Sequence, residues 1–183
     1  TDAQVDATSG TIGLSYAQSE TTGLVKIDRS LVTASGNGSV EVTSKVEEVQ
    51  DVAARVDNQS RFKVAGVLSL RDALNRVEID TDHDQPVSVL TGGTGLTVKA
   101  ETTHDVQLTA IASDSTSLIL AGSGIVSLAQ SDTALLFGGM AGVTNGGPVD
   151  LGASDVFARY AATAVTATGP FTPEELDAAI AEE

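Results

Sequence analysis

The sequence contains no cysteine and no tryptophan, and only six of its 183 residues are aromatic. Without cysteine, disulfides, thiolate metal sites and cysteine nucleophiles are all excluded. Carbohydrate-active sites usually present aromatic platforms, whereas this chain has only Tyr16 and Tyr160 besides four phenylalanines. So acidic a chain does offer carboxylates for the pair that glycoside hydrolysis requires. We expect no enzyme here and rank a small acidic carbohydrate-active enzyme as a distant third function.

Basic residues are also scarce. Lys and Arg together number 10 against 25 Asp and Glu, which gives a formal net charge of −15. Such a charge repels nucleic acid and acidic membrane surfaces, so we expect no direct nucleic-acid partner. Only four residues are lysine, and scarce lysine together with scarce aromatics is typical of halophilic proteins. The alternative is an ordinary acidic, soluble protein.

Long apolar runs are missing as well. No segment approaches the length that a bilayer requires, and no charged segment followed by an apolar one opens the chain. We therefore expect a soluble protein without membrane insertion and without a visible export signal.

Short runs of Val, Leu, Ile and Thr alternate with turn residues over most of the chain, above all in residues 86–138. The clearest strands are 96–101 and 106–110, which we expect to pair in antiparallel fashion. Strands that follow one another so closely in the sequence leave no room for crossover helices. They predict an antiparallel β-sandwich of jelly-roll type. We expect residues 1–22 to form a flexible N-terminal arm and residues 23–183 to form a single β-sandwich domain.

Two segments have the periodicity of short helices. Val46, Val49, Val52 and Val56 recur every three or four positions, and Ser44 begins an S-x-x-E capping box, so we predict a helix at about 45–56. The abundant valines weigh against this helix. A second helix is predicted at about 173–182, where Thr172-Pro173-Glu174-Glu175 has the features of a helix N-terminus.

The best candidate metal ligands are Asp80, Asp82 and Asp84, whose spacing matches the start of a calcium-binding loop. The rest of that motif is absent, so an acidic turn is the competing interpretation. His83 and His104 have no third ligand at a recognisable spacing, and we interpret both as surface turn residues.

No motif for catalysis or cofactor binding is complete. The glycine-rich segment 92–95 lacks the G-K-[ST] end of a phosphate-binding loop and precedes a strand, so we interpret it as a hairpin turn or bulge. Neither histidine has a plausible nucleophile partner, and we predict no catalytic residue and no cofactor. The Asn37 and Asn58 glycosylation triplets are expected to be unmodified unless the protein is exported.

A small, cysteine-free, all-β chain with a polar arm, Gly-rich loops and an acidic composition resembles the single jelly-roll capsid proteins of tailless icosahedral viruses that infect halophilic archaea. The resemblance is one of size, composition and strand rhythm, and no site residues follow from it. It implies a structural virion protein, made in the host cytoplasm, that associates with itself and with other capsid proteins. The alternative is a virion decoration protein or a cell-surface adhesion module.

Overall fold

The structure is a computed structural model that describes residues 2–7, 12–57, 62–79, 89–114, 120–138, 142–145 and 147–168. The described part is all-β and contains ten strands. In chain order they are β1 (Asp2–Ala7), β2 (Ile12–Ile27), β3 (Leu31–Thr33), β4 (Ser39–Asp57), β5 (Phe62–Ile79), β6 (Val89–Gly92), β7 (Gly95–Asp114), β8 (Leu120–Phe137), β9 (Gly142–Asn145) and β10 (Val149–Thr168).

All pairs of neighbouring strands in the described part are parallel. Sheet A has the order β1-β4-β7-β10, sheet B has β2-β5-β8, and sheet C has β3-β6-β9. The chain therefore runs three times through the sequence sheet B, sheet C, sheet A. We call these passes rung 1 (β2, β3, β4), rung 2 (β5, β6, β7) and rung 3 (β8, β9, β10). The architecture is a three-rung parallel β-solenoid, in which each rung packs on its neighbour.

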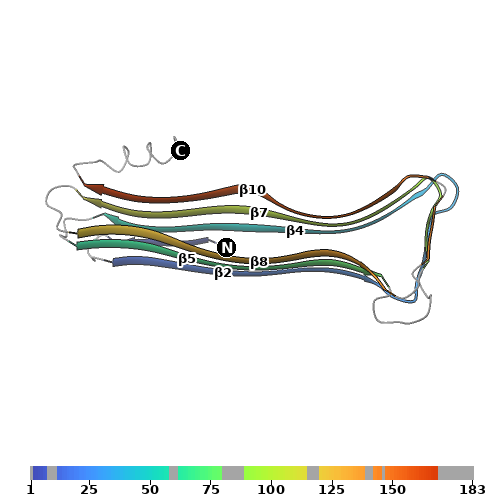
Figure 1. The fold of residues 1–183 in the computed structure, drawn as a ribbon, viewed down its shortest axis with the longest axis horizontal. Helices are drawn as coiled ribbons and strands as arrows, with labels where there is room; N and C mark the ends of the chain where they lie inside the picture. The colour runs from blue at the N-terminus through green and yellow to red at the C-terminus, as the bar shows by residue number, and fades with distance from the viewer. Residues whose placement is uncertain are drawn as a thin grey trace.

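Figure 1 shows sheets A and B as two long layers that face each other, while the chain turns between them at one end. The long strands have 16 to 20 residues. At about 3.3 Å per residue, a rung is therefore about 60 Å long. Across the strands the molecule is much narrower, because sheet B has three strands and sheet A has four. The molecule is a flat slab whose interior lies between sheets A and B.

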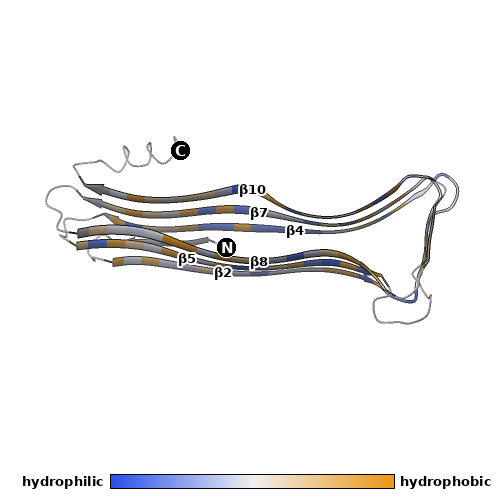
Figure 2. Ribbon diagram, in the orientation of Figure 1, coloured by the Kyte–Doolittle hydropathy of each residue, from blue (hydrophilic) through white to orange (hydrophobic). Residues whose placement is uncertain are grey.

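Alternate residues of the long strands point into this interior, as the period of a β-strand requires. On β4 the even-numbered residues from Val40 to Val56 face inward, and on β5 the odd-numbered residues from Lys63 to Ile79 do so. Hydrophobic and hydrophilic residues are accordingly interleaved along each strand (Figure 2). Two apolar clusters fill the interior, one around Val52, Val67 and Leu108, and one around Val77, Leu96 and Val98 near sheet C.

Glycines allow the rungs to approach closely where sheet C leads into sheet A. A Cβ atom on Gly93 would lie 2.1 Å from the backbone oxygen of Gly36, and one on Gly147 would lie 2.1 Å from that of Thr94. The Thr94 amide donates to the Gly38 carbonyl at 3.0 Å, which connects rung 2 to rung 1. Segment 92–95 is thus a corner between two sheets, and the hairpin predicted there is wrong because β6 and β7 belong to different sheets.

The antiparallel jelly-roll sandwich predicted from the sequence is wrong, because every sheet is parallel. The expected antiparallel pair 96–101 and 106–110 is instead one continuous strand, β7. In a solenoid one face of each strand is buried and the other is solvated, so the strands show the same alternation that usually marks antiparallel sheets. The alternating pattern therefore predicted strands correctly but not their direction.

The helix predicted at 45–56 is also wrong, since these residues belong to β4. The error arose because polar residues occupy inward positions there, which interrupts the apolar alternation of a strand. Residues 12–22, expected in a flexible arm, form part of β2 and pair with β5. The helix predicted at 173–182 lies outside the described residues.

Candidate functional site

A band of buried polar residues separates the two apolar clusters at the middle of the long strands. We call it the polar belt; its members come from four strands and are Ser19, Ser44, Glu48, Gln50, Ser69, Arg71, Asn75, Thr102 and His104. Each is at most 8% exposed. A buried charge is costly unless it is paired, so the stability of the core depends on the contacts that the side chains of the polar belt make with one another.

Glu48 is the centre of the polar belt. Its Oε2 atom lies 2.7 Å from Nδ1 of His104 on the neighbouring strand β7 and 3.8 Å from Nη1 of Arg71 on the opposite sheet. Its Oε1 atom accepts a hydrogen bond from the Ser19 hydroxyl. The carboxylate thus joins β2, β4, β5 and β7, which are the long strands of rungs 1 and 2.

His104 is held between two carboxylates. While Nδ1 faces Glu48, Nε2 lies 2.8 Å from Oδ1 of Asp155 on β10. Both ring nitrogens are therefore within hydrogen-bond distance of a carboxylate, and the Ser19 hydroxyl is bound to Glu48 rather than to the ring. The geometry suits a structural ion cluster better than a serine–histidine relay.

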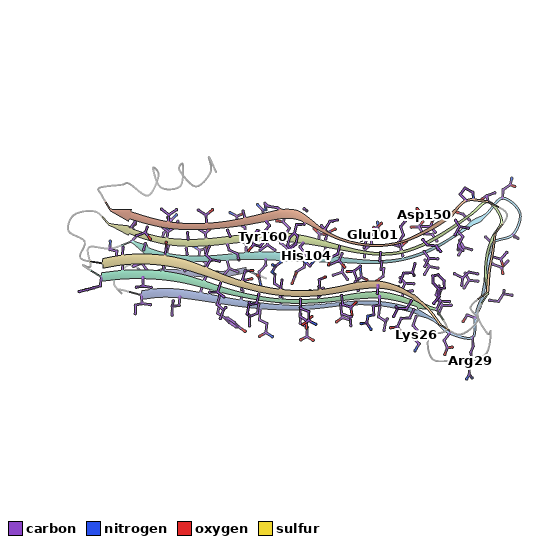
Figure 3. The ribbon with its side chains drawn as sticks, viewed as in Figure 1. Lys26, Arg29, Glu101, His104, Asp150 and Tyr160 are labelled. Atoms are coloured by element: carbon purple, nitrogen blue, oxygen red, sulfur yellow. The ribbon has the colours of Figure 1, made fainter. Side chains whose placement is uncertain are left out.

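Two aromatic side chains of rung 3 lie over the polar belt. Phe157 and Tyr160 of β10 pair with His104 and Val106 of β7, both of which point inward. The Phe157 ring lies 4.9 Å from the His104 ring, and the Arg71 guanidinium lies 5.5 Å from the Phe157 centroid and 5.9 Å from the Tyr160 centroid. Figure 3 shows His104 and Tyr160 close together at the middle of the long layers.

These aromatic residues are exposed although they face the interior. Phe157 is 53% exposed and Tyr160 is 51% exposed, and the inward-facing Leu151 is 46% exposed. The reason is their position, because β8 and β10 are the last strands of sheets B and A in the described part of the chain. We call this surface, formed by β8 and β10, the open end. It presents apolar core residues next to two strand edges, which is the combination that favours pairing with a further strand.

A second exposed apolar surface lies on the outer face of sheet B. Glycines at 66, 122 and 124 leave a shallow groove of about 610 Å³ in this face. Its exposed apolar residues, and those beside it on the same face, are Ile12, Leu14, Tyr16, Phe62, Val64, Leu68, Val126 and Leu128, each 38% to 64% exposed. We call this surface the apolar face. Contiguous apolar surface of this kind usually marks an interaction site.

Ion pairs on the outer face of sheet A connect successive rungs. Lys99 of β7 lies 2.6 Å from Asp150 of β10, and this hydrogen bond raises the pKa of the lysine. Arg159 of β10 lies 2.6 Å from Asp105 of β7. These pairs help to fix the register of rung 3, although exposed ion pairs contribute little to stability.

The candidate residues from the sequence have different outcomes. Asp80, Asp82, Asp84 and His83 lie outside the described residues, so their metal site stays a prediction. His104 is 3% exposed, and its interpretation as a surface turn residue is wrong. In the described residues, no group of three or more His, Asp or Glu side chains is arranged to hold a metal ion.

Sequence reasoning missed the polar belt and the open end. Both depend on which strands become neighbours, and partners such as Glu48 and His104 are 56 residues apart in the chain. The only available signal was the set of polar residues at inward positions of 44–50.

Comparisons with protein-family models, curated proteins and solved structures found no significant match for this chain. In the part of the chain that the structure describes, no helix has the length and apolar character needed to cross a membrane.

Proposed function

We propose that this chain is a structural virion protein whose copies assemble through the open end of the solenoid. The observation that carries the proposal is the exposure of inward-facing Leu151, Phe157 and Tyr160 beside the edges of β8 and β10. A solenoid normally ends in a polar capping repeat, because the last rung otherwise exposes its core. An end of this kind is suited to bind another set of strands.

The negative charge of the chain determines the conditions for such assembly. With a net charge of −15, two copies repel each other at low ionic strength. Salt shortens the screening distance from about 10 Å at 0.1 M to about 3 Å at 1 M, so association should strengthen as salt is added. This behaviour would agree with the halophilic habitat expected from the composition.

Light scattering over a series of protein and salt concentrations tests the proposal. We expect the mass of the wild-type particle to grow with both, and we expect Leu151→Asp to prevent the growth because it would bury a charge in the contact. Ser154→Asp adds the same charge to the exposed outer face of the same strand and is the control. A wild-type chain that stays monomeric at every concentration would overturn the proposal.

The alternative, a virion decoration protein or adhesion module, stays a prediction, as does a place in an icosahedral shell. The apolar face of sheet B is the observation that favours the alternative. If Val126→Lys reduced retention on a host-cell or virion surface while Leu151→Asp did not, the alternative would replace the proposal.

A further inference from the structure

Each rung of the solenoid pairs with the next one through equivalent positions of its long strands. Val40 of β4 pairs with Leu96 of β7, and Leu96 pairs with Val149 of β10. In sheet B, Ile12 pairs with Val64, which pairs with Gly122. If the same register is continued beyond rung 3, β4 of another copy pairs with β10, and β2 of that copy pairs with β8. The two ends of the solenoid are therefore potential partners of each other.

We propose that a second copy of this chain stacks on the open end, with its β2 pairing to β8 and its β4 pairing to β10, and that strand β1 of this copy must first leave β4. This inference rests on the proposed function. It adds that the surface formed by β2 and β4 binds the open end, and that the release of β1 must come first. Because the two surfaces differ, the contact is heterologous and continues from copy to copy as a filament.

Toward the end of each long strand that lies near sheet C, apolar side chains meet apolar side chains in this register. On sheet A, Leu151 would pack against Val42 of the next copy, because both are partners of Val98 or its equivalent. On sheet B, Leu135 would face Val25 by the same rule. The middle of β10, with Phe157 and Tyr160, would lie against the polar belt of the next copy. The stack thus continues the apolar zones of the subunit, and the two aromatic rings would cover the polar belt of the next copy as they cover that of their own, which favours a second copy over an unrelated partner.

Strand β1 occupies part of the edge that this stack requires. It pairs with residues Asp51 to Val56 of β4, on the side of β4 that does not face β7. Residues Ala161 to Thr166 of β10 and residues Asp51 to Val56 of β4 both pair with 107–112 of β7. In the stack, Ala161 to Thr166 of another copy would therefore pair with the same six residues of β4 that β1 occupies. The two strands cannot bind there together, so β1 blocks flush stacking while it stays in place.

The exchange favours the stack once copies are concentrated enough. β1 is six residues long, whereas β10 has 20 residues and brings the edge of β8 with it. Displacement replaces a short pairing by two long ones and covers the exposed core residues of rung 3. Apolar area removed from water is the main favourable contribution to such an association.

A disulfide between β1 and β4 tests the inference. Gln4 and Ala53 are register partners. Neighbouring strands are about 4.8 Å apart, which is within the Cα separation that a disulfide allows. The chain has no other cysteine, so the Gln4→Cys/Ala53→Cys variant can form only this bond within one copy. Oxidised protein should need at least a tenfold higher concentration to assemble than the same protein after reduction. The two single variants, kept reduced, are the controls and should behave as wild type.

Electron microscopy of the assembled wild type completes the experiment. Filaments that grow only when the disulfide is reduced would support the inference. Equal assembly of oxidised and reduced protein, or closed dimers that join two open ends, would overturn the inference while leaving the proposed function intact. Failure of the wild type to assemble at all would overturn both, and the light-scattering series separates this case from the other two.

Discussion

Oε2 of Glu48 lies 2.7 Å from Nδ1 of His104, and both side chains are almost completely buried. The contact joins β4 to β7 at the middle of the solenoid, where Arg71 and Ser19 bind the same carboxylate from the opposite sheet. One side chain therefore connects rungs 1 and 2 as well as sheets A and B.

Removing this carboxylate should destabilise the fold strongly. Glu48→Ala leaves the charged groups of the cluster without their shared partner, and the loss of one member of a buried ion pair costs about 3–5 kcal/mol. Chemical denaturation in urea measures the free energy of unfolding. Glu47→Ala, one residue away on the exposed face of β4, is the control and should change stability by less than about 0.5 kcal/mol. Equal effects of the two substitutions would contradict a central role for the cluster.

The corner glycines give a second prediction. Gly93→Ala would place a methyl group 2.1 Å from a backbone oxygen of the preceding rung, so the rungs would have to separate locally. We expect a loss of about 1–3 kcal/mol, as for other overpacked sites. Gly152→Ala is the matched control, because a Cβ there meets no atom within 4 Å. Thermal unfolding at low salt compares the two variants, and a Gly93→Ala protein as stable as the control would show that the corner is looser than described.

Like charges face each other on the outer side of sheet B. Glu20 of β2 and Asp72 of β5 are register partners and both are exposed. Like charges directly opposite on neighbouring strands destabilise a sheet, so Asp72→Asn should stabilise the subunit by about 0.2–1 kcal/mol at low ionic strength. The gain should disappear in molar salt, where the repulsion is screened. A gain of the same size at all salt concentrations would point to a cause other than charge.

The apolar face of sheet B should bind hydrophobic dyes. We expect Val126→Lys to lower the fluorescence of such a dye markedly, because it places a charge in the groove between Leu68 and the open edge of β8. Thr22→Lys lies on the same outer face but outside the groove and serves as the control. If both variants bound dye as the wild type does, the dye would be binding at the open end instead.

The all-β class was predictable from the sequence, whereas the topology was not. Alternation such as Leu96, Val98 and Ala100 marks a half-buried strand, but it is identical for parallel and antiparallel neighbours. The repeat also escaped detection, because Ile12 pairs 52 residues further on and Phe62 pairs 58 residues further on. Rungs of unequal length leave no fixed period in the sequence.

The candidate site was less predictable than the fold. Inward-facing Ser44, Glu48 and Gln50 interrupt the apolar alternation of β4, so the remaining valines recur every three or four positions and predicted a helix. The same polar residues make the most specific contacts of the core. Single residues such as His104 show nothing of their burial until the neighbouring strand is known. The open end follows from the strand order alone, which no local pattern contains.

The pairing of each rung with the next also bears on how the chain folds. Every strand pair that the structure describes joins residues 49 to 58 positions apart. Contacts of such long sequence separation make folding slow, because a long loop must close, at a cost in conformational entropy, before the hydrogen bonds between its ends can form. During synthesis, β2 of the first rung cannot pair with β5 until that strand of the second rung has left the ribosome. Newly made chains would thus expose unpaired strands at first, close to other nascent chains of the same sequence whose strands can pair with them.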